Sequence, residues 1–468
     1  MSKIEFQKMQ EQGNAFLVTK ELVGDELTPI RIFYALSGEK KFLLESALKK
    51  DDKGRYSFLG ANPYGEVTCD GTIVTVTLNG QKNKQTTEKL IDVLDELIGQ
   101  HPIETTFPFI GGAIGFIGYD TIRQYENIGK LNKDDLDLPE SHLLLYRTII
   151  VFDHLLQKVS LIAFCRGQEK FEDIEQEFTR LETEMTAQHS LQSINTKINR
   201  SIESNLRKEE FLHIVDAAKK EIKAGNIFQV VLSQRFHTTF EGDYFDLYRK
   251  LRISNPSPYL YAIDFGEYQV IGSSPESVVS VKGNVVTTNP IAGTRKRGKT
   301  SEEDHQLENE LLTDEKERAE HFMLVDLARN DIGFVSKIGS IEIPKLMEIE
   351  KYSHVMHLVS EVCGELNDEM TWKDVLPRCL PAGTVSGAPK IEAMTIINEL
   401  ENHKRSIYGG SIGYISFNGS LEMALTIRTM VIKQNDLYVQ AGAGIVYDSK
   451  AINEYEETRH KARALLEV

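Results

Sequence analysis

Apolar residues recur with helical spacing in several parts of the chain. The clearest stretch is 208–224, whose apolar face comprises Phe211, Ile214, Val215, Ala218 and Ile222. Gly225 follows at once and is the residue type that most often ends a helix. Comparable patterns predict helices over about 302–328, 388–401 and 450–466.

Short runs rich in β-branched and aromatic residues alternate with turns and predict strands. In the first part of the chain they occupy 71–80, 146–154 and 158–165. Later strands are expected at 228–236, 259–265, 269–274, 277–283, 409–417, 424–432 and 437–446. Because the strands come in runs with separate helices, the order predicts an α+β fold rather than a regular βαβ alternation.

The pattern changes after residue 165, where the chain becomes polar and rich in Glu, Gln and Ser. We interpret this stretch as a surface helix followed by a connection. The main boundary therefore lies here, with an N-terminal region at 1–165, a connecting segment at 166–207 and a C-terminal region at 208–468.

Charge and cysteine usage restrict the function further. The net charge of −16 argues against nucleic acid or an acidic membrane surface as a partner. The cysteines are scattered and form no CxxC motif, which favours reduced thiols: Cys69, Cys165, Cys363 and Cys379. The first residues lack the apolar segment of a signal peptide, and no apolar run is long enough to span a bilayer. We expect a cytoplasmic protein.

Two pairs of carboxylates stand out in the second half. Glu317 and Glu320 are three residues apart in KERAEH, and Glu454 and Glu457 are three apart in NEYEETRHKA, followed by Lys461. Residues three apart share one face of a helix, so each pair could form half of a Mg²⁺ site. Between the pairs lie glycine-containing strings whose backbone N–H groups could approach an anion: PIAGTR, PAGTVSGAP, YGGSIGY and QAGAGIV. Together they suggest a small anionic substrate held by a hard metal.

Each pattern also has a simpler interpretation. Asp314 and Glu317 have the spacing of a helix-capping box, and a carboxylate pair is usually a solvated helix face. The glycine strings could be strands with close backbone packing, and neither QAGAGIV nor YGGSIGY matches a nucleotide-binding loop. His357 alone would be a core histidine, and Glu276 a turn carboxylate. Spacing alone leaves these interpretations ahead.

Nine short sequence strings in a fixed order favour the functional interpretations over the simpler ones. They are GSSPES, PIAGTR, LLTDEKERAEHFMLVDLARND, YSHVMHLVSEV, PAGTVSGAPK, YGGSIGY, IRT, QAGAGIVYDS and EYEETRHKA. Over nearly its whole length the chain resembles the chorismate-utilising enzymes, and within them the large subunits (component I) of anthranilate synthases. The resemblance implies an α+β fold of two antiparallel β-sheets packed as a sandwich with surrounding helices. It also implies that 1–165 carries regulation and part of the sandwich, and that 208–468 binds chorismate.

The resemblance also implies roles for individual residues. The Mg²⁺ ligands would be Glu317, Glu320, Glu454 and Glu457. Substrate contacts would come from Gly293, Thr294, Tyr408, Gly410, Ser411, Arg428, Ala441, Gly442, Ala443, Gly444 and Lys461. The catalytic set would be Glu276 as the general acid, His357 for pyruvate elimination, and Thr384.

Two positions bear on the choice of reaction. Relatives that make isochorismate or salicylate carry a lysine that activates water where this chain has Gln229, and glutamine cannot act as that base. Aminodeoxychorismate synthases carry PIKGT where this chain has PIAGT, with Ala292. The implied reaction is the Mg²⁺-dependent conversion of chorismate and ammonia to anthranilate and pyruvate, the first committed step of tryptophan biosynthesis. The alternatives are aminodeoxychorismate synthase component I, isochorismate synthase and an inactive tryptophan-binding regulator.

Partners follow from the same resemblance. No glutaminase segment is recognisable, so ammonia would come from a separate glutamine amidotransferase subunit (component II) in a hetero-oligomer. FLLESA (42–47) and NPSPYLYAI (255–263) resemble tryptophan-sensing elements. L-Tryptophan would bind as a feedback inhibitor near Glu45, Ser46, Pro258 and Tyr259, with Glu45 as acceptor for its ammonium group.

Overall fold

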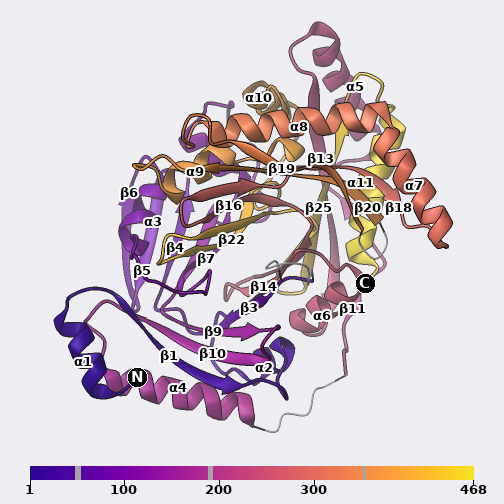
Figure 1. Ribbon diagram of the computed structural model, residues 1–468. Helices are drawn as coiled ribbons and strands as arrows, with labels where there is room; N and C mark the ends of the chain where they lie inside the picture. Colours follow the sequence, from indigo (N-terminus) through magenta and orange to yellow (C-terminus); the bar gives the residue numbers. More distant parts are fainter. Residues whose placement is uncertain (48–53, 188–192, 352–354) are drawn as a thin grey trace.

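The fold is a sandwich of two large antiparallel sheets with helices outside, as expected from the sequence (Figure 1). The computed structural model describes residues 1–47, 54–187, 193–351 and 355–468. The first three residues of the string YSHVMHLVSEV, 352–354, therefore lie outside the described residues. No described helix is both long and apolar enough to cross a membrane.

The first sheet has 13 strands. Its order is β1 (Phe16–Val23), β10 (Lys158–Cys165), β9 (Thr148–Asp153), β3 (Tyr56–Gly60), β2 (Phe42–Glu45), β14 (Tyr259–Asp264), β15 (Gln269–Ser274), β24 (Thr429–Lys433), β25 (Asp436–Ile445), β13 (Gln229–Glu241) and β11 (Lys197–Ile198). The short strands β12 (Glu203–Ser204) and β21 (Gly387–Ala388) also pair with β13.

The second sheet has 12 strands. Its order is β18 (Ile291–Lys296), β20 (Val355–Glu365), β17 (Val285–Thr288), β16 (Ser277–Lys282), β23 (Leu421–Leu425), β22 (Ser411–Ser416), β7 (Gly112–Ile117), β8 (Ser141–Tyr146), β4 (Gly65–Asp70), β5 (Ile73–Leu78) and β6 (Gln81–Thr86). Strand β19 (Glu342–Lys351) pairs with β20.

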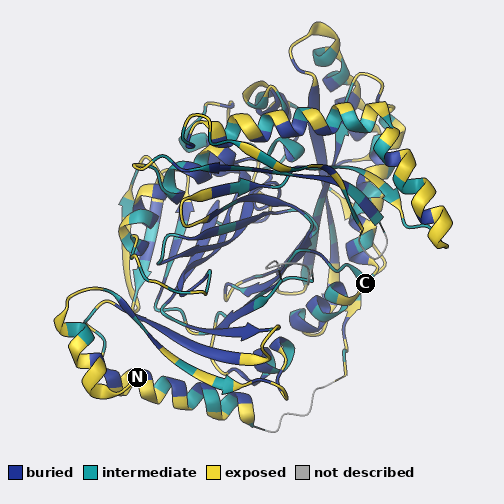
Figure 2. Ribbon diagram, in the orientation of Figure 1, coloured by how far each residue is buried: buried dark blue, intermediate teal, exposed yellow. Residues whose placement is uncertain are grey.

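Helices lie on the outer surfaces, and Figure 2 shows exposed residues along the outer sides of α4, α7 and α8. The α-helices are α1 (Lys3–Glu11), α2 (Pro29–Ala35), α3 (Leu90–Ile98), α4 (Phe171–Thr186), α5 (Lys208–Ala224), α6 (Tyr244–Ser254), α7 (Ser301–Thr313), α8 (Glu315–Gly333), α9 (Trp372–Cys379), α10 (Lys390–Leu400) and α11 (Ala451–Leu466). Short 3₁₀ turns are η1 (Tyr119–Gln124) and η2 (Gly383–Val385).

Alternation along the strands separates two cores. Phe42 of β2 faces the other sheet and packs in one cluster with Ile114 and Met423, whereas its neighbour Leu43 packs on the opposite face with Phe245 of α6. Successive strand residues point to opposite faces, so a strand buried on both sides must be apolar throughout. The apolar runs read from the sequence are therefore strands covered on both faces.

Both sequence regions contribute strands to both sheets. β2 pairs with β14 in the first sheet, and β7 pairs with β22 in the second. The boundary at 166–207 therefore separates two stretches of sequence whose strands share the same two sheets. The regulatory role of 1–165 stays a prediction.

Two predicted elements are divided in the structure. The helix expected at 302–328 is two helices, α7 and α8, because Asp314 leaves the helical conformation and its carboxylate accepts the N–H groups of Lys316 and Glu317. The strand expected at 424–432 is β23 and β24, which belong to different sheets. Arg428 lies between them with a φ of 51°. This crossing places Arg428 at the site described below.

Candidate functional site

A cavity of about 260 Å³ lies between the edges of the two sheets and helices α8 and α11. Its walls come from β13 and β25 of the first sheet, β18 and β20 of the second, and η2. Of the predicted site residues, the lining includes Glu276, His357, Thr384, Thr294, Tyr408, Arg428, Ala441, Gly442, Gly444, Lys461, Glu320 and Glu457. The structure thus brings together residues up to 185 positions apart in the sequence, and the roles of these residues stay predictions.

The Glu276 carboxyl group is buried, and within the described residues it has one hydrogen-bond donor, a neutral hydroxyl. It follows β15 and is 8% exposed, and its Oε1 accepts a hydrogen bond of 2.7 Å from Thr384 Oγ1. Burial raises the pKa of Glu276 to about 7, although the Thr384 hydroxyl and the Lys461 charge oppose the rise. A large fraction of Glu276 therefore carries a proton at neutral pH, as a general acid requires.

Two cations face the same cavity. The Arg428 guanidinium has no hydrogen bond or ion pair with any residue in the described part of the chain, and burial lowers its pKa. Lys461 Nζ donates to the Gly442 carbonyl at 2.9 Å and pairs with Glu457 at 2.8 Å. A bound anion would offset the desolvation of Arg428. Positive charge is thus built locally inside a protein of net charge −16.

Glycine is required where the backbone approaches these side chains. A Cβ atom on Gly442 would lie 2.6 Å from the Tyr408 hydroxyl oxygen, and one on Gly444 would lie 2.8 Å from Gln229 Nε2. Both contacts are too short for any side chain without movement of a neighbour. The glycines of QAGAGIV therefore keep Tyr408 and Gln229 at the cavity wall.

His357 is held against β18. Its Nδ1 lies 3.0 Å from the Gly293 carbonyl and 3.0 Å from Thr294 Oγ1. A carbonyl only accepts, so Nδ1 carries the hydrogen and Nε2 is the acceptor nitrogen. Burial lowers the pKa of His357; the hydrogen bond to Gly293 opposes this and the Arg428 charge adds to it, so that the neutral ring is favoured. A neutral imidazole can accept a proton.

Two of the four predicted Mg²⁺ ligands line the cavity, and the other two lie outside its lining. Glu320 and Glu457 line it, and the negative charges of Glu317 and Glu457 act on Glu320, whose pKa is raised mainly by burial and then by Glu317. Burial also raises the pKa of Glu454, with Glu457 as a contributing neighbour. A divalent cation fits this accumulation of negative charge because it would favour the ionised carboxylates. Within the described residues, however, no three His, Cys, Asp or Glu side chains converge to hold a metal, so coordination stays a prediction.

Comparison with known proteins places the chain in a family. The sequence profile described as chorismate binding enzyme matches residues 40–467. The chain belongs to the chorismate binding enzyme family. Similar family members include the anthranilate synthase component 1 proteins of Acetivibrio thermocellus (45% identity, covering 98% of this chain and 96% of that protein) and Aquifex aeolicus (44%, covering 100% and 97%).

Solved structures agree with this assignment. The crystal structure of anthranilate synthase component I from Streptococcus pneumoniae aligns with a TM-score of 0.82 and 42% identity, over 95% of this chain and 98% of that one. The isochorismate synthase MenF of Escherichia coli aligns with a TM-score of 0.74 at 19% identity over 99% of this chain and 98% of that one, which shows the shared fold. Both confirm the predicted sandwich.

Six residues that the family resemblance assigned to the site lie outside the cavity lining. Gly293, Gly410, Ser411, Ala443, Glu317 and Glu454 do not line the cavity. Gly293 has a φ of 63°, where glycine turns the chain beside Glu317, and the N–H of Gly410 donates to the Ile407 carbonyl at 3.2 Å. Glu317 pairs with Arg295 at 3.2 Å. The substrate and metal contacts of these residues stay predictions.

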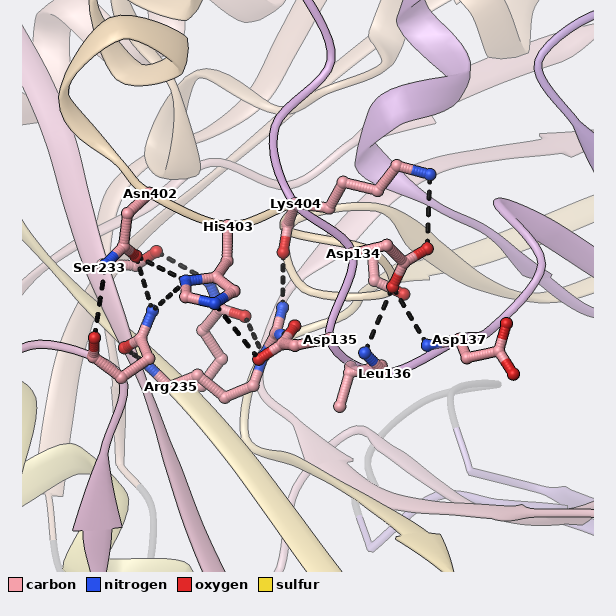
Figure 3. Close-up of polar contacts among 12 residues, drawn as sticks. Asp134, Asp135, Leu136, Asp137, Ser233, Arg235, Asn402, His403 and Lys404 are labelled. Carbon is pink, nitrogen blue, oxygen red and sulfur yellow. Dashed lines mark hydrogen bonds and ion pairs between the residues drawn. The ribbon is translucent and has the colours of Figure 1, made fainter.

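Gln440 lines the cavity but was not selected from the sequence. Its Oε1 accepts from Arg235 Nε at 3.1 Å, and its Nε2 donates to Ser233 Oγ at 2.8 Å. Arg235 in turn pairs with Asp135 and donates to the Lys404 carbonyl, in the network of Figure 3. The only sequence signal was that Gln440 opens the string QAGAGIV. The apolar lining residues were not selected either, because their local sequence carries no signal of a site: Val231, Pro275, Ile291, Leu324, Val385, Ile427 and Leu465.

The two predicted tryptophan-sensing segments of the family lie side by side, away from the cavity lining. Glu45 of β2 is opposite Leu260 of β14, next to Pro258 and Tyr259, and the N–H of Ala47 donates to the Ser257 carbonyl at 3.0 Å. The Glu45 carboxylate already accepts hydrogen bonds from Tyr248 (2.6 Å) and Arg252 (2.5 Å). Nothing in the described contacts tests ligand binding here.

Proposed function

We propose that the chain is an anthranilate synthase component I, which converts chorismate and ammonia to anthranilate and pyruvate in the cytoplasm. One observation carries the choice among family reactions. Gln229 and Ala292 both line the cavity that contains Glu276, so the two wall positions that bear lysine in other family branches have no amine here. Ammonia, which is already a nucleophile, needs no such base.

The residues of the chain suggest how the reaction proceeds. Arg428 and Lys461 hold a carboxylate of the substrate by charge-assisted hydrogen bonds. Glu276, held by Thr384, donates its proton to the ring hydroxyl as ammonia adds and water leaves. Neutral His357 then assists loss of pyruvate, after which the ring becomes aromatic.

Mg²⁺, held by Glu317, Glu320, Glu454 and Glu457, would supply positive charge for the second carboxylate. Ammonia comes from a glutamine amidotransferase subunit, and L-tryptophan inhibits by binding near Glu45, Ser46, Pro258 and Tyr259. The activity would open the committed route to tryptophan.

The test is to incubate the purified chain with chorismate, MgCl₂ and ammonium chloride at neutral pH. We expect anthranilate fluorescence and an equal amount of pyruvate, each formed about 10²–10⁴ times more slowly by Glu276→Gln. Formation of aminodeoxychorismate or isochorismate in place of anthranilate, identified by mass spectrometry, would replace this function by another of the same family.

A further inference from the structure

A second, smaller cavity of about 40 Å³ lies directly behind the acid of the catalytic cavity. Glu276, Thr384 and Leu324 line both cavities, so these residues form the wall between them. The remaining polar lining includes Thr288, Asn289 and Asp331. A water molecule requires roughly 10–15 Å³ by this measure and two to four polar partners, so the space suits about two waters.

Asp331 connects this small cavity to the exterior. Its Oδ2 accepts from Lys390 Nζ at 2.8 Å, and the two side chains are 17% and 15% exposed. Among the described lining residues, Asp331 and Glu276 alone carry a carboxyl group. Burial raises the pKa of Asp331 while Lys390 opposes the rise, so this carboxyl is easier to protonate than an exposed aspartate.

Glu276 needs a proton source once it has acted. In the proposed reaction it gives its proton to the departing hydroxyl and becomes a carboxylate, while the proton lost by the added ammonium leaves to solvent. The groups facing it in the catalytic cavity are poor donors: Lys461 is held by Glu457 and Gly442, and the Nδ1 hydrogen of His357 is directed to Gly293. Glu276 also lines the small cavity, from which a proton could reach it.

We infer that the small cavity holds water that returns a proton to Glu276, with Asp331 as the relay to solvent. One proton passes from a cavity water to the Glu276 carboxylate, Asp331 replaces it on that water, and solvent protonates Asp331 again. No bond other than O–H is made or broken, and no oxidant or reductant is involved. Asp331 acts through Glu276 and does not touch the substrate. This inference rests on the proposed function.

The experiment compares steady-state anthranilate formation by Asp331→Asn, Asp331→Glu and wild type. Asparagine keeps the shape but cannot carry the proton. We expect kcat to fall about tenfold, less than the 10²–10⁴ expected for loss of the acid itself. The value of kcat/KM for chorismate should be unchanged, because the proton returns after the products form. Formic acid added to the assay should restore kcat, and Asp331→Glu should keep most of it.

Two further variants separate the relay from damage to the fold. Asp153→Asn removes another buried, ion-paired aspartate, bound to Arg55 at 2.8 Å and not on either cavity, and should leave kcat unchanged. Ala328→Leu fills the small cavity without changing charge and should lower kcat in the same way as Asp331→Asn. Far-UV circular dichroism and thermal unfolding check each variant.

Unchanged kcat in Asp331→Asn would overturn the relay. A parallel fall of kcat and kcat/KM without rescue by formic acid would also overturn it, because that result indicates a structural role for the ion pair. If the wild-type chain forms no anthranilate, the proposed function itself fails and the relay with it.

Discussion

Glu276 and Glu45 are both buried glutamates, 8% and 6% exposed, yet their surroundings differ in one respect. Glu45 ends β2 and accepts hydrogen bonds from Arg252 and Tyr248 of α6. Glu276 accepts a hydrogen bond from the Thr384 hydroxyl, and the charge of Lys461 opposes the rise of its pKa. A cation at hydrogen-bond distance offsets the desolvation of a buried carboxylate. Glu276 has only a hydroxyl at that distance, and burial raises its pKa to about 7. The two buried glutamates therefore differ in the groups that donate hydrogen bonds to them, not in how far they are buried.

The largest effect is expected from Glu276→Gln. Glutamine preserves size and the Thr384 contact but cannot donate an acidic proton, so kcat should fall by about 10²–10⁴ with little change in the melting temperature. Anthranilate fluorescence gives the rate. A variant with more than a tenth of wild-type activity would show that Glu276 is not the acid.

Glu45→Gln should lower stability but leave catalysis almost unchanged, the opposite of Glu276→Gln. It leaves Arg252 without its buried carboxylate, so the free energy of unfolding should fall by about 1–3 kcal/mol while catalysis without tryptophan stays within about twofold. Chemical denaturation and the same fluorescence assay measure both quantities. Equal losses of catalysis in Glu45→Gln and Glu276→Gln would remove the contrast between the two regions.

Replacing the cavity-lining glutamates Glu320 and Glu457 should change how activity depends on Mg²⁺ concentration. Neutral amides are poorer Mg²⁺ ligands than carboxylates, so Glu320→Gln and Glu457→Gln should lose most of their activity at limiting Mg²⁺. Isothermal titration of the chain with MgCl₂ should show binding that both variants weaken. Activity within about twofold of wild type at limiting Mg²⁺ would exclude these glutamates as ligands.

The smallest effect on catalysis is expected at Ser46. Because β2 and β14 adjoin, a bulky side chain here should weaken tryptophan binding and spare uninhibited turnover. Calorimetric titration with L-tryptophan, alongside inhibition curves for wild type and Ser46→Phe, tests this. The site is wrong if wild type binds no tryptophan or if both proteins are inhibited equally.

The local sequence pattern predicted individual helices and strands better than it predicted which sheet each strand joins. The helix at 208–224 is observed as Lys208–Ala224, with Gly225 in the left-handed conformation, because periodicity and a cap are local signals. The break at Arg428 was missed because its neighbours Ile427 and Thr429 are β-branched and look like a continuous strand. What turns the chain there is pairing with two different sheets, which no short window contains.

The candidate site was predicted through resemblance, not spacing. Spacing alone favoured a turn carboxylate for Glu276 and a core position for His357. In the structure Glu276 is buried, whereas His357 is half-buried, and both line the cavity. Their convergence depends on pairings such as β18 with β20, between residues about 60 positions apart. Gln440 could not be found from either source, since its orientation is set by Arg235 and Ser233.

The most direct test of the central claim is the pH dependence of kcat/KM for chorismate, measured at a constant concentration of free NH₃ by adjusting total ammonium. This quantity reports the free enzyme, in which Glu276 has a pKa of about 7 and must be protonated to act. We predict that kcat/KM falls about tenfold per pH unit above pH 7 in wild type, and that the low residual activity of Glu276→Gln lacks this fall. A wild-type profile that stays level up to pH 9 would contradict the account.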